Sequence, residues 1–187
     1  MKLALQCSPV LTGIKISNLL IIHKLEVNDV IKKFRDTLIN VYILYTIGQK
    51  AILLIYREEQ LEIYLKSERV KELMYRLGYR YKNIDDVLIQ FAKRYRNCRS
   101  SREKFPHEMG LILGYPVDDV QGFIENRGMN FLYVGYWKVY GNLLEAIETF
   151  QKYDFVKEIA IRTVKSKKDI LQLLDLYYTS SLNRYEI

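Results

Sequence analysis

The stretch from Phe105 to Tyr140 reads FPHEMGLILGYPVDDVQGFIENRGMNFLYVGYWKVY and carries the strongest local pattern of the chain. Two apolar patterns with helical spacing, at 107–113 and 117–126, are joined there by Gly114-Tyr115-Pro116. Glycine allows the left-handed backbone of a tight turn, and proline suits the first turn of a helix. An aromatic, strand-like segment follows at 131–140. The stretch therefore predicts a helical elbow followed by a strand.

The elbow has the outline of a helix-turn-helix unit, with Gly110 as the small residue where two helices would cross. A DNA-reading unit presents polar and basic residues on its second helix. Here that helix starts with Asp118-Asp119, which we expect to be exposed. Carboxylates stabilise a helix N-terminus and repel DNA, so we interpret the elbow as a compact helical corner.

Upstream, the runs 41–47 and 51–57 are rich in β-branched and aromatic residues and flank Gly48-Gln49-Lys50, which is typical of a hairpin. Both runs are nearly continuous in apolar residues, so we expect both faces to be covered. The pattern predicts one α+β domain. A small mixed or antiparallel sheet, made of the hairpin 41–57 plus a strand near 131–140, would pack with six or seven helices.

The remaining segments have weaker patterns. We expect residues 1–16 to be irregular because Pro9 and Gly13 interrupt them. The other predicted elements are a strand at 17–22, a helix capped by Asn28 and ending near Asn40, a helix that starts at Glu58, a second one marked by apolar residues at 70–77, a third capped by Asn83 or Asp85, a helix at 142–153 capped by Asn142, a strand at 155–164 and a last helix at 169–178.

Composition points to a folded protein outside the membrane. The chain has 187 residues, of which 49% are hydrophobic, and Tyr occurs 16 times. No apolar run reaches the roughly 18 to 20 residues that a membrane-spanning helix needs. Two cysteines, Cys7 and Cys98, suggest no disulfide framework. We expect a soluble, cytoplasmic protein.

The net charge of +7 is concentrated in residues 66–104, which hold twelve Lys or Arg against five Asp or Glu. A localised basic segment attracts phosphate groups. One alternative is therefore a nucleic-acid-binding protein, and the other is a solvated pair of helices. The nucleic-acid candidates are Arg94, Arg96, Arg99 and Arg102.

A second alternative is a thiol- or His-dependent enzyme or a metal-binding protein. Cys7 lies eight residues before Lys15, and a nearby ammonium group can lower a thiol pKa. His107-Glu108 begins like a zincin motif, but position 111 is Leu rather than a second His. The sequence therefore predicts no metal site, and a structural role for His107 and Cys7 stays open.

The segment from Gly135 to Tyr140 contains the single Trp. Strand alternation places Tyr136, Lys138 and Tyr140 on one face and Trp137 with Val139 on the other. Two tyrosines around a lysine could bind an anion or a flat ligand, or Trp137 could anchor a core.

FPHEMGLILGYPVDDVQGFIEN, GYWKVYGN and the early stretch CSPVLTGIK together resemble the bacterial family catalogued as domain of unknown function 3793. The resemblance covers residues 7–153, leaving 154–187 as a C-terminal extension that we expect to pack on the same domain. It implies a cytoplasmic, single-domain protein from anaerobic, mostly Gram-positive bacteria. It implies no cofactor and no catalytic residue.

The functional prediction is a binding module for a small anionic ligand or a protein partner. Its candidate site residues are His107, Glu108, Tyr136, Lys138, Lys15 and Cys7.

Overall fold

The structure is a computed structural model that describes residues 1–101 and 105–174. Its elements in chain order are α1 (Lys2–Leu11), β1 (Ser17–His23), the 3-10 helix η1 (Lys24–Glu26), α2 (Val27–Phe34), β2 (Asn40–Ile47), β3 (Lys50–Tyr56), α3 (Glu58–Lys66), α4 (Glu68–Arg76), α5 (Ile84–Ser101), α6 (Met109–Ile112), α7 (Val117–Glu125), β4 (Tyr133–Val134), β5 (Lys138–Val139), α8 (Leu143–Lys165) and the 3-10 helix η2 (Ile170–Leu174). The predicted α+β class is confirmed. The helix expected at 169–178 reaches beyond the described residues.

The main sheet is antiparallel, with strand order β1-β3-β2. The predicted hairpin is confirmed, and Ser17 of β1 and Asn40 of β2 both lie opposite Tyr56 of β3. Apart from Lys50, all of β3 is buried, as expected for a covered strand. β2 is instead a half-exposed edge strand, so the expectation of two covered faces is wrong for this strand.

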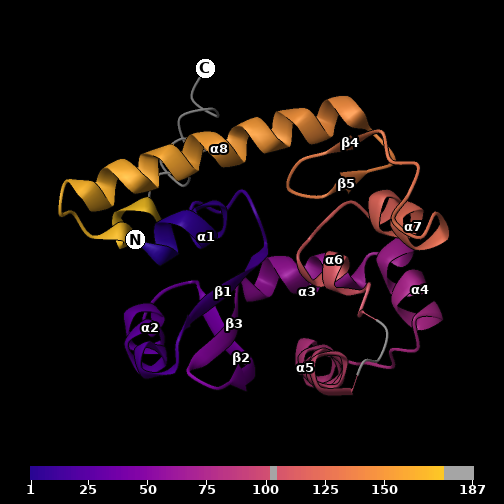
Figure 1. Cartoon of the computed structure of the whole chain (residues 1–187), viewed down its shortest axis with the longest axis horizontal. Coiled ribbons are helices and arrows are strands. Elements are labelled where there is room, and N and C mark those ends of the chain that lie inside the picture. The colour runs from indigo at the N-terminus through magenta and orange to yellow at the C-terminus, as the bar shows by residue number, and fades with distance from the viewer. Residues whose placement is uncertain (102–104, 175–187) are drawn as a thin grey trace.

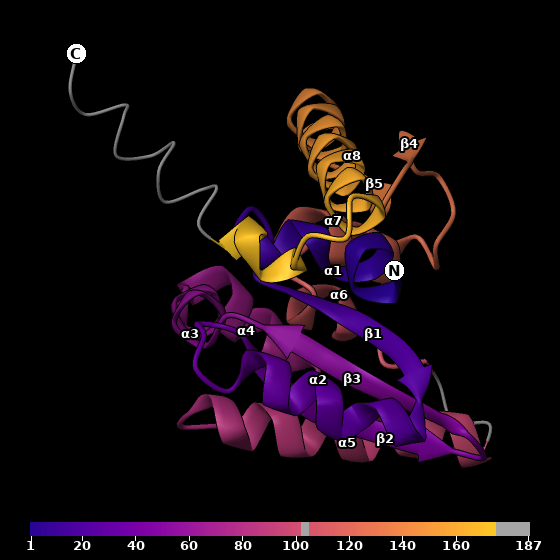
Figure 2. The ribbon, with the colours of Figure 1, turned by 90° about the vertical axis from the view of Figure 1, so that its left-hand side faces the viewer.

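Alternate residues of β3 enter two hydrophobic clusters, one on each side of the sheet. Ile52 and Leu54 pack with α3, α4, α5 and α6. Leu53 and Ile55 pack with α1, α2, the C-terminal part of α8 and η2. Figure 2 shows the three strands side by side, with α1 and α8 above the sheet and α5 below it. Because successive side chains of a strand point to opposite faces, β3 packs against both helical layers.

The strand expected at 131–140 does not join this sheet. Among the described residues, 133–134 and 138–139 pair only with each other, as β4 and β5, and the third strand of the main sheet is β1. The small hairpin lies beside α7 and the start of α8, as Figure 1 shows. A strand-like composition does not by itself select a partner, because pairing depends on the packing of the whole fold.

The expectation of an irregular N-terminus is wrong, because residues 2–11 form α1 with Pro9 inside it. Ala4, Cys7 and Leu11 recur at helical spacing and are fully buried. The buried Arg57 side chain donates hydrogen bonds to the carbonyls of Val10 (2.8 Å) and Leu11 (2.9 Å) at the C-terminal end of this helix. Packing and this distant cap outweigh the local cost of proline.

The strand expected at 155–164 is also wrong, because α8 continues through Lys165. Asn142 caps the helix as predicted, its side chain accepting from the amide of Glu145 at 3.3 Å. The buried residues Phe150, Tyr153 and Ala160 lie at intervals of three and seven, which is helical spacing. The long helix runs along the top of the molecule in Figure 1.

Helix α2 differs from the prediction at both ends. Asn28 lies inside the helix, which follows a 3-10 turn capped by His23. The helix ends at Phe34, and Asn40, the predicted end, is instead the first residue of β2. The three predicted helices between residues 58 and 101 are confirmed as α3, α4 and α5. Within residues 1–101 and 105–174, no helix has both the length and the apolar character to cross a membrane.

Candidate functional site: a pocket at the helical elbow

The elbow forms where α6 and α7 cross. Gly110 lies at the crossing, and a Cβ atom built on it would stand 2.7 Å from Cγ2 of Val120. Gly114 has the left-handed φ of +72° that the sequence predicts for the turn. The amide of Tyr115 then closes the turn on the carbonyl of Gly110 at 2.9 Å.

Asp119 fastens the elbow to the β4–β5 hairpin. Its carboxylate accepts hydrogen bonds from Trp137 Nε1 (2.6 Å) and from the amides of Tyr140 (2.7 Å) and Gly141 (2.8 Å). The expectation that Asp118 and Asp119 are both exposed is therefore wrong for Asp119, which is 3% exposed. Helical geometry turns only Asp118 toward solvent, where it pairs with Arg69.

Trp137 is buried at 8% exposure and stacks on Tyr115, with ring centroids 4.9 Å apart. It also packs edge-on against Phe150 of α8. The anchoring role that the sequence left open is therefore observed. The indole joins elbow, hairpin and α8 in one small cluster.

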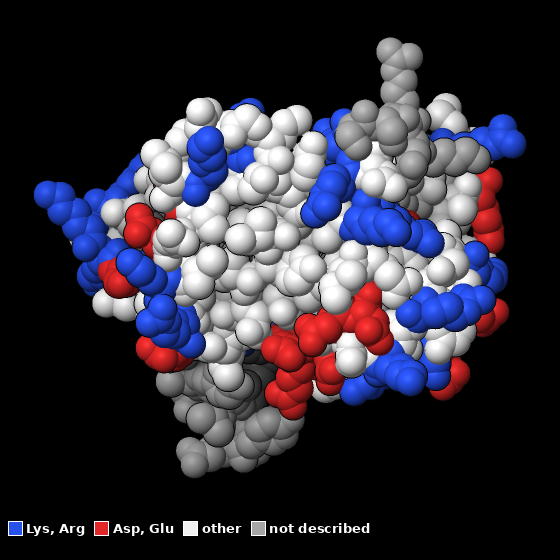
Figure 3. Space-filling model, turned by 90° about the horizontal axis from the view of Figure 1, so that it is seen from below, with Lys and Arg blue, Asp and Glu red and all other residues white. Residues whose placement is uncertain are grey.

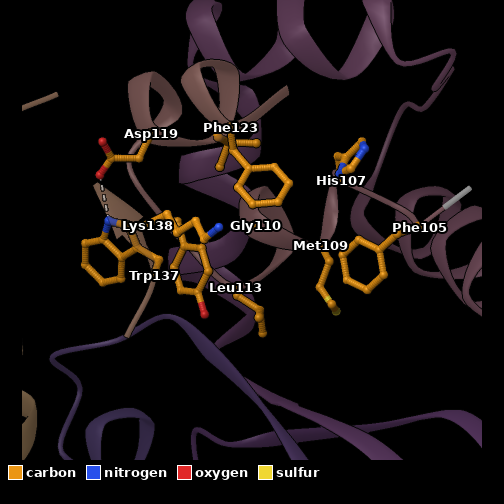
Figure 4. Close-up of a pocket in the computed structure, with 11 residues that line it drawn as sticks. Phe105, His107, Met109, Gly110, Leu113, Asp119, Phe123, Trp137 and Lys138 are labelled. Carbon is orange, nitrogen blue, oxygen red and sulfur yellow. Dashed lines mark hydrogen bonds between the residues drawn. The ribbon is translucent and has the colours of Figure 1, made fainter. Parts of the chain in front are cut away.

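These contacts leave a pocket of about 210 Å³ on the elbow. Figure 4 shows side chains from the α6 region, α7 and the β5 hairpin converging on it. Its lining residues are Phe105, His107, Met109, Gly110, Leu113, Tyr115, Asp119, Val120, Phe123, Trp137 and Lys138. Apart from three charged or imidazole side chains, the lining is apolar and aromatic.

Lys138 brings a positive charge to this pocket. Its ammonium donates a hydrogen bond to the carbonyl of Gly128 at 2.6 Å and lies 4.6 Å from the ring centroid of Phe131. In the described part of the chain it has no carboxylate partner. Two of its three donors are left for a ligand.

His107 lines the same pocket, with its ring between Phe105 and Phe123 at centroid distances of 6.0 and 5.5 Å. Its Nδ1 atom is buried and has no hydrogen-bond partner among the described residues. An unpaired buried nitrogen costs free energy unless a ligand or water supplies a partner. Phe123 lies between the imidazole and the ammonium of Lys138 (Figure 4).

Glu108 does not belong to the pocket, although it follows His107 directly. It is 3% exposed and accepts hydrogen bonds from the hydroxyl of Tyr79 (3.0 Å) and from Arg94 (3.3 Å). These contacts tie the start of α6 to α5 and to the loop after α4. Its role is therefore structural.

Lys15, Cys7 and Tyr136 gather in a different region, between α1, β1 and α8. Lys15 and Tyr136 line a second cavity of about 240 Å³. Burial raises the pKa of the Cys7 thiol to about 12, more than the charge of Lys15 can offset, so the thiol stays protonated at neutral pH. The expectation of an activated cysteine is not supported, because its desolvation is the larger effect.

The structure also separates the thiol from the imidazole. Cys7 belongs to the cluster under α1, whereas His107 lines the elbow pocket. In residues 1–101 and 105–174, no three or more His, Cys, Asp or Glu side chains are arranged to hold a metal ion.

The arginine candidates for nucleic-acid binding lie on α5, except Arg102, which lies outside the described residues. Arg94 packs 4.6 Å above the ring of Tyr79 and bonds to the carbonyl of Leu77 at 2.8 Å. Arg96 is exposed on the helix, and Arg99 contacts the hydroxyl of Tyr95 at 3.3 Å. On the face seen in Figure 3, Lys and Arg are interspersed with acidic residues around a broad uncharged area.

Sequence reasoning missed Tyr115 and Phe123 as pocket residues and Asp119 as the buried anchor. The aromatic residues of the central stretch were a usable signal for the pocket residues. Phe105, Tyr115 and Phe123 all belong to the short segment that forms the elbow, and all three line the pocket. The role of Asp119 had no local signal, because its three donors lie 18 to 22 residues further along the chain.

Fold and site define a class: an α+β domain whose helical elbow forms a small aromatic pocket with one unpaired cation. A family model described as "Protein of unknown function (DUF3793)" matches residues 3–174. The chain belongs to this family, as the resemblance predicted. No curated protein and no solved structure matched the chain.

Proposed function

We propose that the protein is a binding module for a small anionic ligand, an aromatic or similarly flat ring with one negative group, held in the elbow pocket. The observation that carries this proposal is an apolar pocket lined by a lysine that forms no ion pair and by a histidine nitrogen that has no hydrogen-bond partner among the described residues. The Lys138 ammonium has no carboxylate partner among the described residues, and the buried Nδ1 of His107 has no partner there. Convergent polar groups in an apolar pocket are the usual mark of a ligand site.

The size of the pocket limits the ligand. A cavity of about 150 Å³ holds benzene, and drug-sized ligands need roughly 300 Å³ or more. At about 210 Å³, the elbow pocket suits one ring with one small substituent. The rings of Phe123 and Tyr115 supply flat apolar surface for it.

The carboxylate of Asp119 does not occupy the donors of Lys138. Asp119 lines the pocket, but its two oxygens already accept three hydrogen bonds. The other donors of Lys138 are therefore available to an anionic ligand, and charge-assisted hydrogen bonds are stronger than neutral ones.

The single Trp makes a direct test possible, because Trp137 lines the pocket. Its fluorescence is titrated with benzoate, phenyl phosphate and the neutral benzyl alcohol. We expect saturable changes with both anions and binding of the alcohol at least about tenfold weaker, since a hydrogen bond to a charged group contributes about 1.5–3 kcal/mol. Equal affinity for anion and alcohol, or no saturable change, would contradict the proposal.

Substitution of the cation gives the matched comparison. Lys138→Met keeps the apolar stem and should weaken benzoate binding about tenfold while leaving benzyl alcohol unchanged. The control is Lys152→Met, which removes an exposed lysine of α8. If both variants weaken benzoate equally, the effect is a general one of net charge and the site assignment fails.

Nucleic-acid binding through residues 66–104 is the weaker alternative. Arg94 and Arg99 are already engaged by neighbouring side chains or carbonyls. Filter binding of duplex DNA and single-stranded RNA at 50 and 200 mM salt separates the two functions. An affinity that falls steeply with salt would favour this alternative.

A soluble, cytoplasmic location in bacteria remains part of the proposal. Its support is the family membership together with the lack of a membrane-crossing helix among the described residues. Fractionation of the producing cells, followed by detection of the chain in the soluble fraction, tests it.

A further inference from the structure

Lys15 is a buried amine without a counter-charge. It is 5% exposed, and within the described residues it forms no ion pair. Its backbone amide bonds to the carbonyl of Pro9 at 3.0 Å, which fixes the turn between α1 and β1. Its ammonium donates to Asn18 Oδ1 at 2.7 Å and lies 5.2 and 5.9 Å from the ring centroids of Tyr115 and Tyr153.

The amine lines a cavity separate from the elbow pocket. This cavity has a volume of about 240 Å³ and is bounded by α1, β1, Tyr136 and α8. Lys157 of α8 lines it as well and forms no ion pair in the part of the chain that the structure describes. The cavity therefore offers one amine that can react and a second cation that can hold an anionic group.

The groups that face Lys15 do not offset the effect of burial on its pKa. Burial lowers the pKa of Lys15 to about 7, against a small opposing effect of Cys7. Burial also raises the pKa values of Cys7, Tyr115 and Tyr153, so these groups are neutral at pH 7. Asp154 of α8 accepts a hydrogen bond from the hydroxyl of Tyr136 at 2.7 Å and forms no ion pair with Lys15. A large fraction of the amine is therefore unprotonated at neutral pH.

We propose that Lys15 forms an imine with a small carbonyl compound that carries a carboxylate, such as an α-keto acid or glyoxylate, bound in this cavity between α1, β1 and α8. A desolvated lysine is the usual amine for such a reaction, since the nucleophile is the neutral form. Lys157 pairs with the carboxylate. This site is independent of the elbow pocket, so either proposal can fail alone.

The reaction needs no oxidant or reductant. The lone pair of Lys15 Nζ attacks the carbonyl carbon, a C–N bond forms, and the carbonyl electron pair passes to oxygen, which takes a proton. The resulting carbinolamine then loses its hydroxyl and the second amine proton as water. The products are one C=N bond and one water molecule for each carbonyl consumed.

The experiment traps the imine in the wild-type protein. The folded chain is incubated at pH 7 with glyoxylate and sodium cyanoborohydride, which reduces an imine to a stable secondary amine, and peptide mass spectrometry locates the adduct. We expect Lys15 to be modified at least about tenfold faster than Lys152, an exposed lysine of α8 in the same sample. Modification of Lys15 at or below the rate of Lys152 would overturn the proposal.

Two comparisons test the remaining parts. Acetaldehyde, which lacks the carboxylate, should modify Lys15 more slowly than glyoxylate does, and Lys157→Met should remove that preference. If Lys157→Met leaves the preference unchanged, the assignment of the carboxylate site is wrong. The rate at Lys15 should reach half its maximum near pH 7, whereas a rate that still rises steeply above pH 9 would mean an ordinary lysine.

Discussion

At the scale of single residues, the carboxylate of Asp119 supplies hydrogen-bond acceptors that the β4–β5 hairpin does not have within itself. It satisfies the indole N–H of Trp137 and two consecutive backbone amides, at 2.6 to 2.8 Å. A two-stranded ribbon with only two residue pairs has little stability of its own. The hairpin therefore depends on contacts with the rest of the fold, and Asp119 supplies the polar ones described above.

Asp119→Ala should lower the free energy of unfolding by about 3 kcal/mol, because three donors lose their acceptor in a buried site. Urea denaturation followed by circular dichroism measures this. The neighbouring Asp118→Ala removes a surface ion pair with Arg69 and should leave the midpoint close to that of wild type. Equal effects of the two variants would show that Asp119 has no special structural role.

Lys15 gives a pH dependence of stability. The unfolded chain holds this proton up to its ordinary pKa of 10.5, whereas the folded protein releases it near pH 7. Between these values the unfolded state binds more protons, so the free energy of unfolding rises with pH by up to about 1.4 kcal/mol per unit. Below pH 7 the cost of burying the charged form is present in full.

Lys15→Met removes this dependence. The free energy of unfolding of wild type minus that of the variant should become more positive by about 2 kcal/mol between pH 7 and pH 9. Cys7, whose folded pKa is raised from 9.0 to about 12, opposes the trend above pH 9 in both proteins, so its effect largely cancels in this difference. Parallel stability curves for the two proteins, measured by urea denaturation, would contradict the prediction.

At the scale of elements, the crossing of α6 and α7 sets the width of the elbow pocket. Gly110→Ala would place a methyl group 2.7 Å from Cγ2 of Val120, so the two helices must separate. We expect a loss of about 1–3 kcal/mol in the free energy of unfolding, as for other overpacked sites. Chemical denaturation measures it.

A double-mutant cycle distinguishes the clash from a general effect of the substitution. Val120→Ala removes the methyl group that Gly110→Ala would meet, so the double variant should be more stable than the sum of the two single effects predicts. Strict additivity would mean that Gly110 is needed for a reason other than the close approach of α7.

Elements also show where local patterns fail. The apolar positions of α1 and of the second half of α8 contact one another across the fold. A proline in one segment and β-branched residues in the other argue locally against helix. Burial against each other and against β1 outweighs those local preferences, which amount to about 3 kcal/mol for an interior proline and less than about 1 kcal/mol for each β-branched residue.

At the scale of the whole molecule, β3 is the shared centre of the two large hydrophobic clusters. It pairs with a strand on each side and contributes alternate residues to the helical layers above and below. Global unfolding is therefore needed to expose its amides, whereas the β4–β5 hairpin can open locally.

Hydrogen exchange followed by mass spectrometry should find the amides of β3 among the slowest in the chain and those of residues 133–139 faster by orders of magnitude. Both segments are aromatic or β-branched, so their compositions would not separate them. Equal protection in the two would show that the hairpin belongs to the same cooperative unit as the sheet.

Features that arise from neighbouring residues could be predicted from the amino-acid sequence. The hairpin around Gly48, the helices between residues 58 and 101, the Gly114 turn and the cap at Asn142 are all confirmed. Each rests on backbone preferences or side-chain bonds that span only a few residues.

Which polar groups share a cavity could not be predicted in this way and is known from the three-dimensional fold alone. His107 and Lys138 both line the elbow pocket, whereas Glu108, next in sequence to His107, accepts hydrogen bonds from Tyr79 and Arg94. Burial likewise favours the neutral form of both Lys15 and Cys7. The neutral form is the nucleophile for an amine, whereas a thiol is the nucleophile only when it is deprotonated. These outcomes depend on contacts between distant segments and on desolvation. A side chain is removed from water only when the chain folds, so its sequence neighbours do not reveal how strongly its pKa shifts.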